Sequence, residues 1–269
     1  MKFEHVLYEK GDKCTWITIN HPERLNSFDA ETILDLTNAI EMAALDRLNA
    51  AIVITGAGDK AFCAGGFLKD LTDMNPERGR FLFGQTIRCT DAMRRAPMPV
   101  IAAVNGWAMG GGNELVIAAD FAIASEHAKL GQTGPKVGSA PVFGATNLMA
   151  LNCGEKRAKE ISMMCKQYTA QECYELGWIN RVVPHDQLRT EVQHWVDELS
   201  ERAPSYIELC KVTSNVWWDM LSPMYQHAQQ TLIRLAGGPE MREGATAFVE
   251  KRKPNFHQFR EALAAMKRN

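Results

Sequence analysis

The sequence has no long apolar run and no marked excess of charge of either sign. No stretch approaches the ~20 apolar residues that a membrane-spanning helix needs. The 269 residues carry a net charge of −2, which gives no support for a nucleic-acid or membrane-surface partner. The N-terminal segment MKFEHVLYEKGDK is polar and mixed in charge, unlike a signal peptide. These absences predict a cytoplasmic protein that binds neither nucleic acid nor membrane.

Paired cysteines and the common nucleotide and nucleophile motifs are missing as well. The seven cysteines are scattered singly, which is typical of reduced buried thiols and indicates no metal site. There is no GxxxxGK[ST] loop and no early GxGxxG turn, so neither a P-loop nor a Rossmann nucleotide site is indicated. A GxSxG elbow is absent too, which argues against a Ser–His–Asp hydrolase.

Hydrophobic periodicity predicts an α/β fold. One segment alternates with period two and three are continuous apolar runs, as in strands buried on both faces. These strand segments are 14–20, 50–56, 99–106 and 120–125. Because helical patterns separate them, we expect a mostly parallel sheet covered by helices.

Helical periodicity is clear in three places. The first helix is expected to begin after Asp29 as N-cap. Its apolar face would consist of Ile33, Leu36, Ile40, Ala44 and Leu48. A short apolar helix is expected at 114–119, an amphipathic one at 188–199, and further helices up to Lys267. No linker or repeat interrupts the chain, so we expect an α/β core over 1–200 and a helical C-terminal region over 201–269.

Two glycine-rich turns join predicted strands to predicted helices. They are DKAFCAGGFLKDL (59–71) and NGWAMGGGNEL (105–115). Glycine lets backbone N–H groups approach a ligand closely, and the N-terminus of a helix adds partial positive charge. Two such turns facing each other would direct two N–H groups at one developing oxyanion. A purely structural turn is the alternative for each.

Six segments, taken in order, resemble the crotonase (enoyl-CoA hydratase/isomerase) superfamily. They are HPERLNSF, AFCAGGFLKD, PVIAAVNGWAMGGGNELVIAADFAIA, LGQTGPKVG, LGWINRVVP and FVEKRKPNF. The resemblance covers nearly the whole chain. It implies a crotonase-like ββα superhelix with a helical C-terminal trimerisation region, assembled as a homotrimer or homohexamer. It also implies an acyl-CoA substrate, with coenzyme A bound as part of that substrate and no tightly bound cofactor.

The same resemblance assigns roles to individual residues. Gly66 and Gly111 would supply the two N–H groups of an oxyanion hole for a thioester enolate. The residues implied for the coenzyme A site, with two lysines as candidate phosphate contacts, are Arg24, Leu25, Ala64, Phe67, Leu68, Lys69 and Lys253. Trp107, Gly134 and Phe143 are candidates for the acyl pocket, although aromatic residues at such positions are often plain core.

The acid and base residues limit the reactions that the chain can catalyse. Hydratases that the chain resembles use two glutamates, one in each of two loops, for general acid–base catalysis. Glu114 matches the first, whereas the second position is occupied by Gly134, which cannot carry a proton. The alternative is that Glu114 is a capping or ion-paired residue at the start of the helix, where the helix dipole favours a carboxylate. One missing acid therefore argues against a standard hydratase.

The segment 131–147 resembles two subgroups of the superfamily. GQTGPKVGS is similar to dihydroxynaphthoyl-CoA synthase, in which a bicarbonate ion replaces the missing base, but Pro141 and the retained Glu114 depart from that pattern. GGGxE, GPKxGSA, GAT and KRKPxF resemble ring-opening hydrolases of cyclic β-oxoacyl-CoA thioesters, such as 6-oxocyclohex-1-ene-1-carbonyl-CoA and 2-oxocyclohexanecarboxyl-CoA hydrolases.

The residues are chemically consistent with hydrolytic C–C cleavage. Glu114 would activate water, the two glycine N–H groups would stabilise the enolate, and Ser139 would hydrogen-bond the ketone or hydrate oxygen. Ser139 is equally plausible as a turn residue after Gly138. The other readings are an enoyl-CoA hydratase/isomerase, a ring-closing synthase assisted by bicarbonate, and a non-catalytic CoA-binding scaffold.

Overall fold

Two β-sheets form the centre of the computed structural model, which describes residues 2–141, 143 and 145–266. The larger sheet has six strands in the order β1 (Val6–Lys10), β2 (Cys14–Ile19), β3 (Ala51–Gly56), β5 (Val100–Val104), β7 (Phe121–Ser125) and β10 (Arg181–Val183). The smaller sheet has the order β4 (Ala61–Cys63), β6 (Trp107–Met109), β8 (Lys129–Gly131) and β9 (Gln167–Thr169). The α/β class and the mostly parallel sheet are confirmed.

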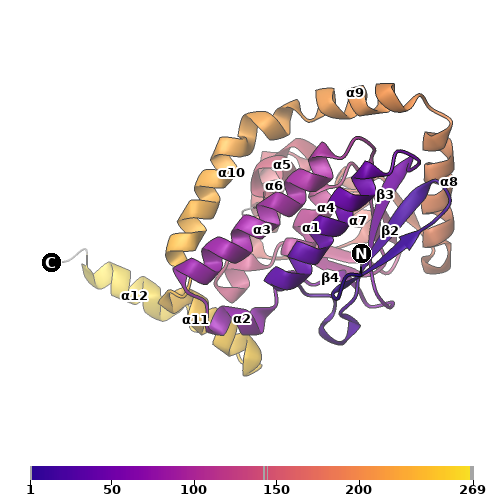
Figure 1. Ribbon diagram of the computed structural model, residues 1–269. Helices are drawn as coiled ribbons and strands as arrows, with labels where there is room; N and C mark the ends of the chain where they lie inside the picture. The colour runs from indigo at the N-terminus through magenta and orange to yellow at the C-terminus, as the bar shows by residue number, and fades with distance from the viewer. Residues whose placement is uncertain (1, 142, 144, 267–269) are drawn as a thin grey trace.

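Antiparallel pairing occurs only at sheet edges among the described strands. β1 pairs antiparallel with β2, and β8 with β9, whereas β2, β3, β5, β7 and β10 run parallel. The three apolar runs form β3, β5 and β7, and successive side chains enter different cores. Ile52 and Ile54 face α1 (Ala30–Leu45), while Val53, Ile101 and Ile123 face α8 (Leu188–Ser200). Helices therefore cover both faces of the sheet (Figure 1).

The first helix confirms its N-terminus and corrects its length. Asp29 caps α1 by accepting the Thr32 N–H at 2.9 Å. The helix ends at Leu45, because the Asn49 side chain donates to the Ala43 carbonyl and the chain turns. Leu48 is 86% exposed, so its place on the apolar face was wrong.

The remaining helices connect the strands and then continue alone to the C-terminus. Those between strands are α2 (Leu68–Thr72), α3 (Pro76–Arg95), α4 (Gly111–Ala118), α5 (Ala145–Cys153), α6 (Glu155–Met164) and α7 (Ala170–Glu175). Three short 3-10 turns are η1 (Pro22–Arg24), η2 (Gly134–Val137) and η3 (His185–Gln187). The C-terminal helices after α8 are α9 (Pro204–Ser214), α10 (Val216–Leu235), α11 (Pro239–Val249) and α12 (His257–Met266). No helix in the described ranges is long and apolar enough to cross a membrane.

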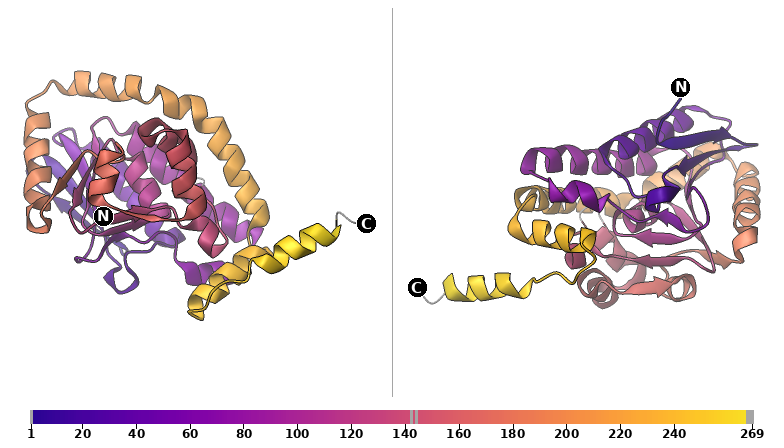
Figure 2. Two further views of the ribbon diagram at one scale, coloured as in Figure 1. Left: turned by 180° about the vertical axis from the view of Figure 1, so that it is seen from behind. Right: turned by 90° about the horizontal axis from the view of Figure 1, so that it is seen from below.

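The C-terminal helices run around the outside of the core and return to it. α9 and α10 pass along one side of the molecule, and α11 comes to lie beside α2 (Figure 1). α11 also packs on η2, so closely that a Cβ at Gly138 would lie 2.5 Å from the Glu240 carbonyl oxygen. α12 has no buried residue and projects from the body (Figure 2). A C-terminal helix thus contacts both the helix α2 and the 3-10 turn η2, which are distant in sequence.

A buried ion pair attaches α9 to the core. The Lys211 ammonium, whose side chain is 5% exposed, lies 2.6 Å from Asp120 and also donates to the carbonyls of Met93 and Met98. Burial lowers the pKa of Lys211, and the Asp120 charge partly offsets that effect. Removing one partner of such a pair leaves an uncompensated charge.

Lys211→Met should therefore destabilise the protein by roughly 3 kcal/mol, measured by denaturant unfolding. Lys13→Met is the matched control, since Lys13 and Asp197 form an exposed pair at 3.4 Å and such pairs contribute about 0–1 kcal/mol. Equal losses for the two variants would contradict a special role for the buried pair.

Candidate functional site

The first glycine turn is held by a short parallel bridge to the segment before α1. The Phe28 N–H donates to the Gly65 carbonyl at 2.9 Å, and the Phe67 N–H donates to the Phe28 carbonyl at 2.8 Å. Alternate backbone groups of an extended strand point to opposite sides. Gly66 lies between the two bonded groups, so its N–H points away from Phe28 and toward the cavity that Gly66 lines.

The second glycine turn leads directly into α4. Gly110 is the N-cap, with φ of +54°, and the helix begins at Gly111, three residues earlier than the predicted 114. The first N–H groups of a helix have no partner within the helix, and they carry the positive end of its dipole. The N–H of Gly111 is therefore a donor at the positive end of α4.

The two turns approach each other so closely that only glycine fits between them. A Cβ at Gly112 would lie 1.9 Å from the Cys63 carbonyl oxygen. A Cβ at Gly65, whose φ is +92°, would lie 2.7 Å from the Met109 carbonyl oxygen. This backbone-to-backbone packing brings Gly66 and Gly111 to one cavity. The two turns predicted to face each other do so.

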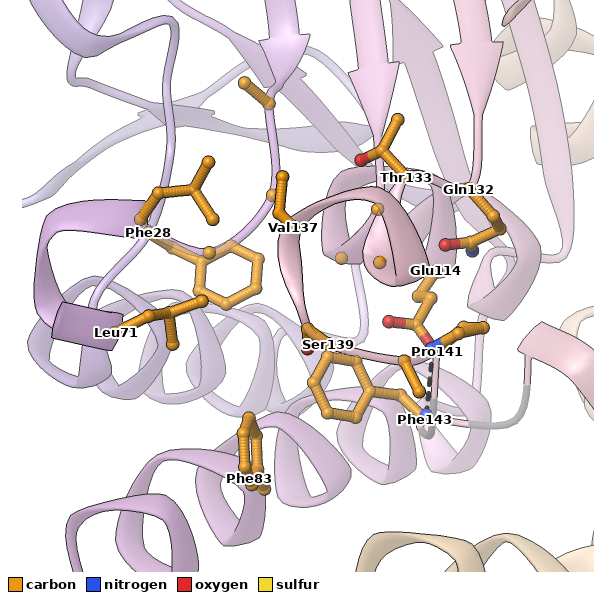
Figure 3. Close-up of a pocket in the computed structure, with 18 of the residues that line it drawn as sticks. Phe28, Leu71, Phe83, Glu114, Gln132, Thr133, Val137, Ser139, Pro141 and Phe143 are labelled. Atoms are coloured by element: carbon orange, nitrogen blue, oxygen red, sulfur yellow. Dashed lines mark hydrogen bonds between the residues drawn. The ribbon is translucent and has the colours of Figure 1, made fainter. Parts of the chain in front are cut away.

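That cavity has a volume of about 100 Å³. Its wall is mostly apolar, with side chains from α2, α3 and the loops around them (Figure 3). The apolar side chains are Phe28, Ala64, Leu68, Leu71, Leu82, Phe83, Val137, Ala140, Pro141 and Phe143. The polar side chains of the lining are Glu114, Gln132, Thr133 and Ser139. Such an apolar wall can bind an acyl group, and the few polar side chains can orient it or take part in the reaction.

Glu114 is the only acid among the described residues that line the cavity. Its side chain comes from the first turn of α4 and the residue is 4% exposed. Oε1 accepts the backbone N–H of Phe143 at 2.9 Å, as Figure 3 shows. The carboxylate is thus oriented by the loop that follows η2. A general base needs such orientation and a place within reach of the substrate.

No acid takes the second position. Gly134 lines the cavity at the start of η2, and a Cβ there would meet Ala140 and the Ser139 carbonyl at 3.0 Å. The tight turn is closed by the Ser139 N–H, which donates to the Gly134 carbonyl at 2.9 Å. A Cβ at this position is therefore a tight fit, and its neighbours would have to shift by a few tenths of an ångström to admit one. Ser139 is partly exposed and lines the same cavity.

Several other residues singled out in the sequence do not line this cavity. The Arg24 guanidinium pairs with Asp29 at 2.8 Å and lies over the Phe67 ring, 4.8 Å from its centroid. The Leu25 carbonyl accepts the Ala64 N–H at 3.0 Å, which ties the two loops implied for coenzyme A. Ala64 itself is in the lining.

Trp107 does not lie where it was predicted, in the acyl pocket. It is 42% exposed and absent from the described lining, because β6 alternates and places Ala108 inward. Lys69 and Lys253 are exposed and outside the cavity, so their phosphate contacts stay a prediction. The segment around Lys253 is held by Arg252, whose guanidinium donates to both carboxylate oxygens of Glu243.

The sequence did not indicate several residues of the cavity, among them Phe28 and Gln132. Phe28 supplies both the backbone bridge to the first turn and an aromatic wall. Gln132 is 1% exposed and reaches the lining from the end of β8. The signal for Gln132 in the sequence is its place two residues before Gly134, the position of the missing acid. Nothing in the sequence alone indicated the contacts of Phe28.

Asp29 gives the loop before Phe28 a defined pH dependence. Burial raises the pKa of Asp29, but hydrogen bonds from Thr32 and the ion pair with Arg24 outweigh it and lower the pKa to about 2. Because the folded-state pKa lies below the unfolded value, the stabilisation is complete above about pH 5 and is lost as pH falls toward 2.

Asp29→Asn should remove about 2 kcal/mol of stability at pH 7 and little at pH 2. Denaturant unfolding of both proteins between pH 2 and pH 7, values chosen to bracket the expected titration, measures this difference. A difference that does not change with pH would contradict the assignment to the carboxylate.

Comparison with known proteins identifies the family of the chain. A family model described as enoyl-CoA hydratase/isomerase matches residues 9–260. An enoyl-CoA hydratase from Mycobacterium avium subsp. paratuberculosis K-10 is 28% identical, with a TM-score of 0.84 over 95% of this chain and 99% of that one. An enoyl-CoA hydratase from Bacillus anthracis is 30% identical, with a TM-score of 0.76 over 94% and 99% of the two chains. An enoyl-CoA hydratase/isomerase from Xanthobacter autotrophicus Py2 is 27% identical, with a TM-score of 0.84 over 94% and 100%.

Proposed function

Because the chain belongs to the enoyl-CoA hydratase/isomerase family, that is, the crotonase superfamily, we propose that it opens the ring of a cyclic β-oxoacyl-CoA by hydrolysis. The observation that carries the proposal is the acid–base content of the cavity. Glu114 is its one acid among the described lining residues, and the position of a second acid is occupied by Gly134 in a tightly packed turn. Hydration of a double bond by this family's usual route needs two carboxylates, whereas hydrolytic cleavage needs one base that later returns its proton.

The proposed reaction uses each polar group once. Glu114 takes a proton from water as the hydroxyl oxygen bonds to the ring ketone carbon. The bond between that carbon and the α-carbon then breaks, and its electron pair moves into the thioester to form an enolate. The N–H groups of Gly66 and Gly111 stabilise the enolate oxygen. Glu114 returns the proton to the α-carbon, and the product is an open-chain carboxylic acid that keeps its CoA thioester.

Further residues around Glu114 and the two glycine turns would bind the substrate. Ser139 hydrogen-bonds the ketone or the hydrate oxygen from the η2 side of the cavity. Coenzyme A binds along the loops of Leu25 and Ala64, which share a hydrogen bond, with Lys69 and Lys253 as phosphate contacts. No step needs a resident cofactor. The cytoplasmic location is part of the same proposal.

A homotrimer or homohexamer is proposed for the assembly. The described surface of the C-terminal helices supports it, because α12 buries nothing within the chain and α10 exposes large apolar side chains. These include Trp217, 54% exposed, and Met220, 64% exposed. Apolar surface of this kind marks association sites. Light scattering coupled to gel filtration measures the mass directly.

The second candidate function is an enoyl-CoA hydratase/isomerase reaction, which fits the family equally. Isomerisation in particular moves one proton and is compatible with a single carboxylate. A bicarbonate-assisted ring closure is less well supported, since the buried Glu114 already supplies a base. A non-catalytic CoA-binding scaffold is disfavoured by the joint presence of Glu114 and both glycine turns in one cavity.

Mass spectrometry of products from a panel of acyl-CoA thioesters tests the proposal. The panel pairs 2-oxocyclohexanecarboxyl-CoA with crotonyl-CoA and a β,γ-enoyl-CoA, each with and without bicarbonate. Gain of one water with an opened dicarboxylic chain supports hydrolysis. Rapid 3-hydroxybutyryl-CoA formation or double-bond migration, without ring opening, would refute it. A bicarbonate-dependent rate would favour the ring-closing chemistry, and no turnover or α-proton exchange would favour the scaffold.

A further inference from the structure

The amide of Gln132 is a buried polar group whose hydrogen-bonding capacity the described part of the chain leaves unused. Gln132 is 1% exposed, and neither Nε2 nor Oε1 has a partner among the described residues. Leaving a buried amide unpaired costs roughly 1–3 kcal/mol, and such groups are uncommon in folded proteins. A partner supplied by a ligand removes that cost.

The position of Gln132 is fixed by the same backbone that carries the oxyanion donors. The Gly110 N–H donates to the Gly131 carbonyl at 2.9 Å, which joins the end of β8 to the N-cap of α4. On the other side a Cβ at Gly131 would lie 2.7 Å from the Lys166 carbonyl oxygen, so β8 has no room to shift. Gln132 is therefore held in a constant relation to Gly111 and Glu114.

Gln132 differs from the other polar side chains of the cavity wall in its burial and in the hydrogen bonds that it can make. Figure 3 places Gln132 and Glu114 on one side of the cavity, with Phe28 and Leu71 on the other. An ionised carboxylate only accepts hydrogen bonds, whereas a neutral amide has two N–H donors and a carbonyl acceptor. Thr133 and Ser139 are the other neutral polar side chains of the lining, and both are more exposed than Gln132. Gln132 is thus the deeply buried donor of the wall.

We propose that Gln132 binds the β-oxygen of the acyl group and makes the site select β-oxoacyl thioesters over acyl thioesters that lack this oxygen. Nε2–H donates to the ketone oxygen before water adds. After addition Nε2–H donates to one oxygen of the hydrate. Oε1 accepts a hydrogen bond from the hydroxyl group at the other oxygen. The proposal rests on the proposed function for the identity of the reacting ketone, but a binding preference is measurable without cleavage.

Calorimetric titration with two ligands tests the selection. The ligands are 2-oxocyclohexanecarboxyl-CoA and cyclohexanecarboxyl-CoA, which differ in the β-oxygen. Glu114→Gln serves as the parent protein so that neither ligand is consumed. In this parent the oxo ligand should bind at least ~10-fold more tightly, and Gln132→Met should abolish the difference by weakening the oxo ligand alone, from the usual worth of one buried hydrogen bond.

Gln85→Leu is the matched control, because Gln85 also has an unpartnered buried Oε1 but lies in α3 outside the described lining. It should change neither affinity. The melting temperature of Gln132→Met should equal or exceed that of the parent, since an unpaired buried amide is replaced by an apolar chain of similar length.

Three results would overturn the assignment. An intact preference in Gln132→Met, or equal weakening of both ligands, would make Gln132 structural. Bicarbonate that changes the affinity for cyclohexanecarboxyl-CoA in the parent, but not in Gln132→Met, would assign the amide to an anion. The proposed function fails separately: a retained oxo preference without any ring-opened product from the wild-type protein removes the cleavage reaction and leaves the binding assignment.

Discussion

Replacing Glu114 by Gln should lower kcat by at least ~100-fold, the usual worth of a general base. Glu114 is the one acid among the described lining residues, so no neighbour there can take over its proton. The amide retains an oxygen that can accept the Phe143 N–H now bonded to Oε1 at 2.9 Å. Folding should therefore survive while proton transfer does not.

Two readouts separate the base from a merely structural role. The first is turnover of whichever thioester the product panel identifies. The second is exchange of the substrate α-proton with deuterium from solvent, which reports enolate formation whatever the final product is. Glu126→Gln, on an exposed carboxylate that pairs with His127, is the control and should leave both rates unchanged. Near-wild-type exchange in Glu114→Gln would return Glu114 to a helix-capping role.

Replacing Gly111 by Ala should cost about 100-fold in kcat, in the range seen when one oxyanion donor is lost. The new methyl group would lie 2.5 Å from Cζ and 2.8 Å from Cε1 of Phe28, too close for van der Waals contact. The Phe28 ring must move, and its backbone is bonded on both sides of Gly66. A substitution in the second turn therefore displaces the first turn as well, and both N–H donors lose their alignment.

Gly84→Ala provides the contrast. Gly84 lies within α3, and a Cβ there meets nothing within 4 Å. The change should leave kcat unaltered and add roughly 0.5–1 kcal/mol of stability, since alanine is favoured over glycine inside a helix. If Gly111→Ala kept full activity at an unchanged melting temperature, the alignment of the two turns through Phe28 would be wrong.

The sequence by itself determined the fold class and the chemistry-bearing loops. Apolar runs at 50–56, 99–106 and 120–125 need cover on both faces, and helical periods between them supply it, so a parallel sheet follows from local pattern. Glycine in the two turns and the absence of an acid at Gly134 are properties of the chain that need no coordinates. Its family resemblance extended these observations to Glu114 and to a thioester enolate.

The tertiary structure decided which of these residues meet. Trp107 lies outside the acyl pocket because the alternation of side chains along β6 directs it outward, with 42% of its surface exposed. Leu48 lies outside the core because α1 ends at Leu45, where the Asn49 side chain closes a turn. Such outcomes depend on contacts between distant segments, which residue types alone do not specify.

Gln132 is the clearest case. In the sequence it is only a polar residue two positions before Gly134. Only the folded chain shows that both amide atoms are buried without a partner among the described residues, in the wall that also holds Glu114. Local pattern determines where strands and turns form, since it acts over a few residues. The burial and pairing of a single polar side chain are set by every segment that packs around it, and for that reason the structure alone identified this residue.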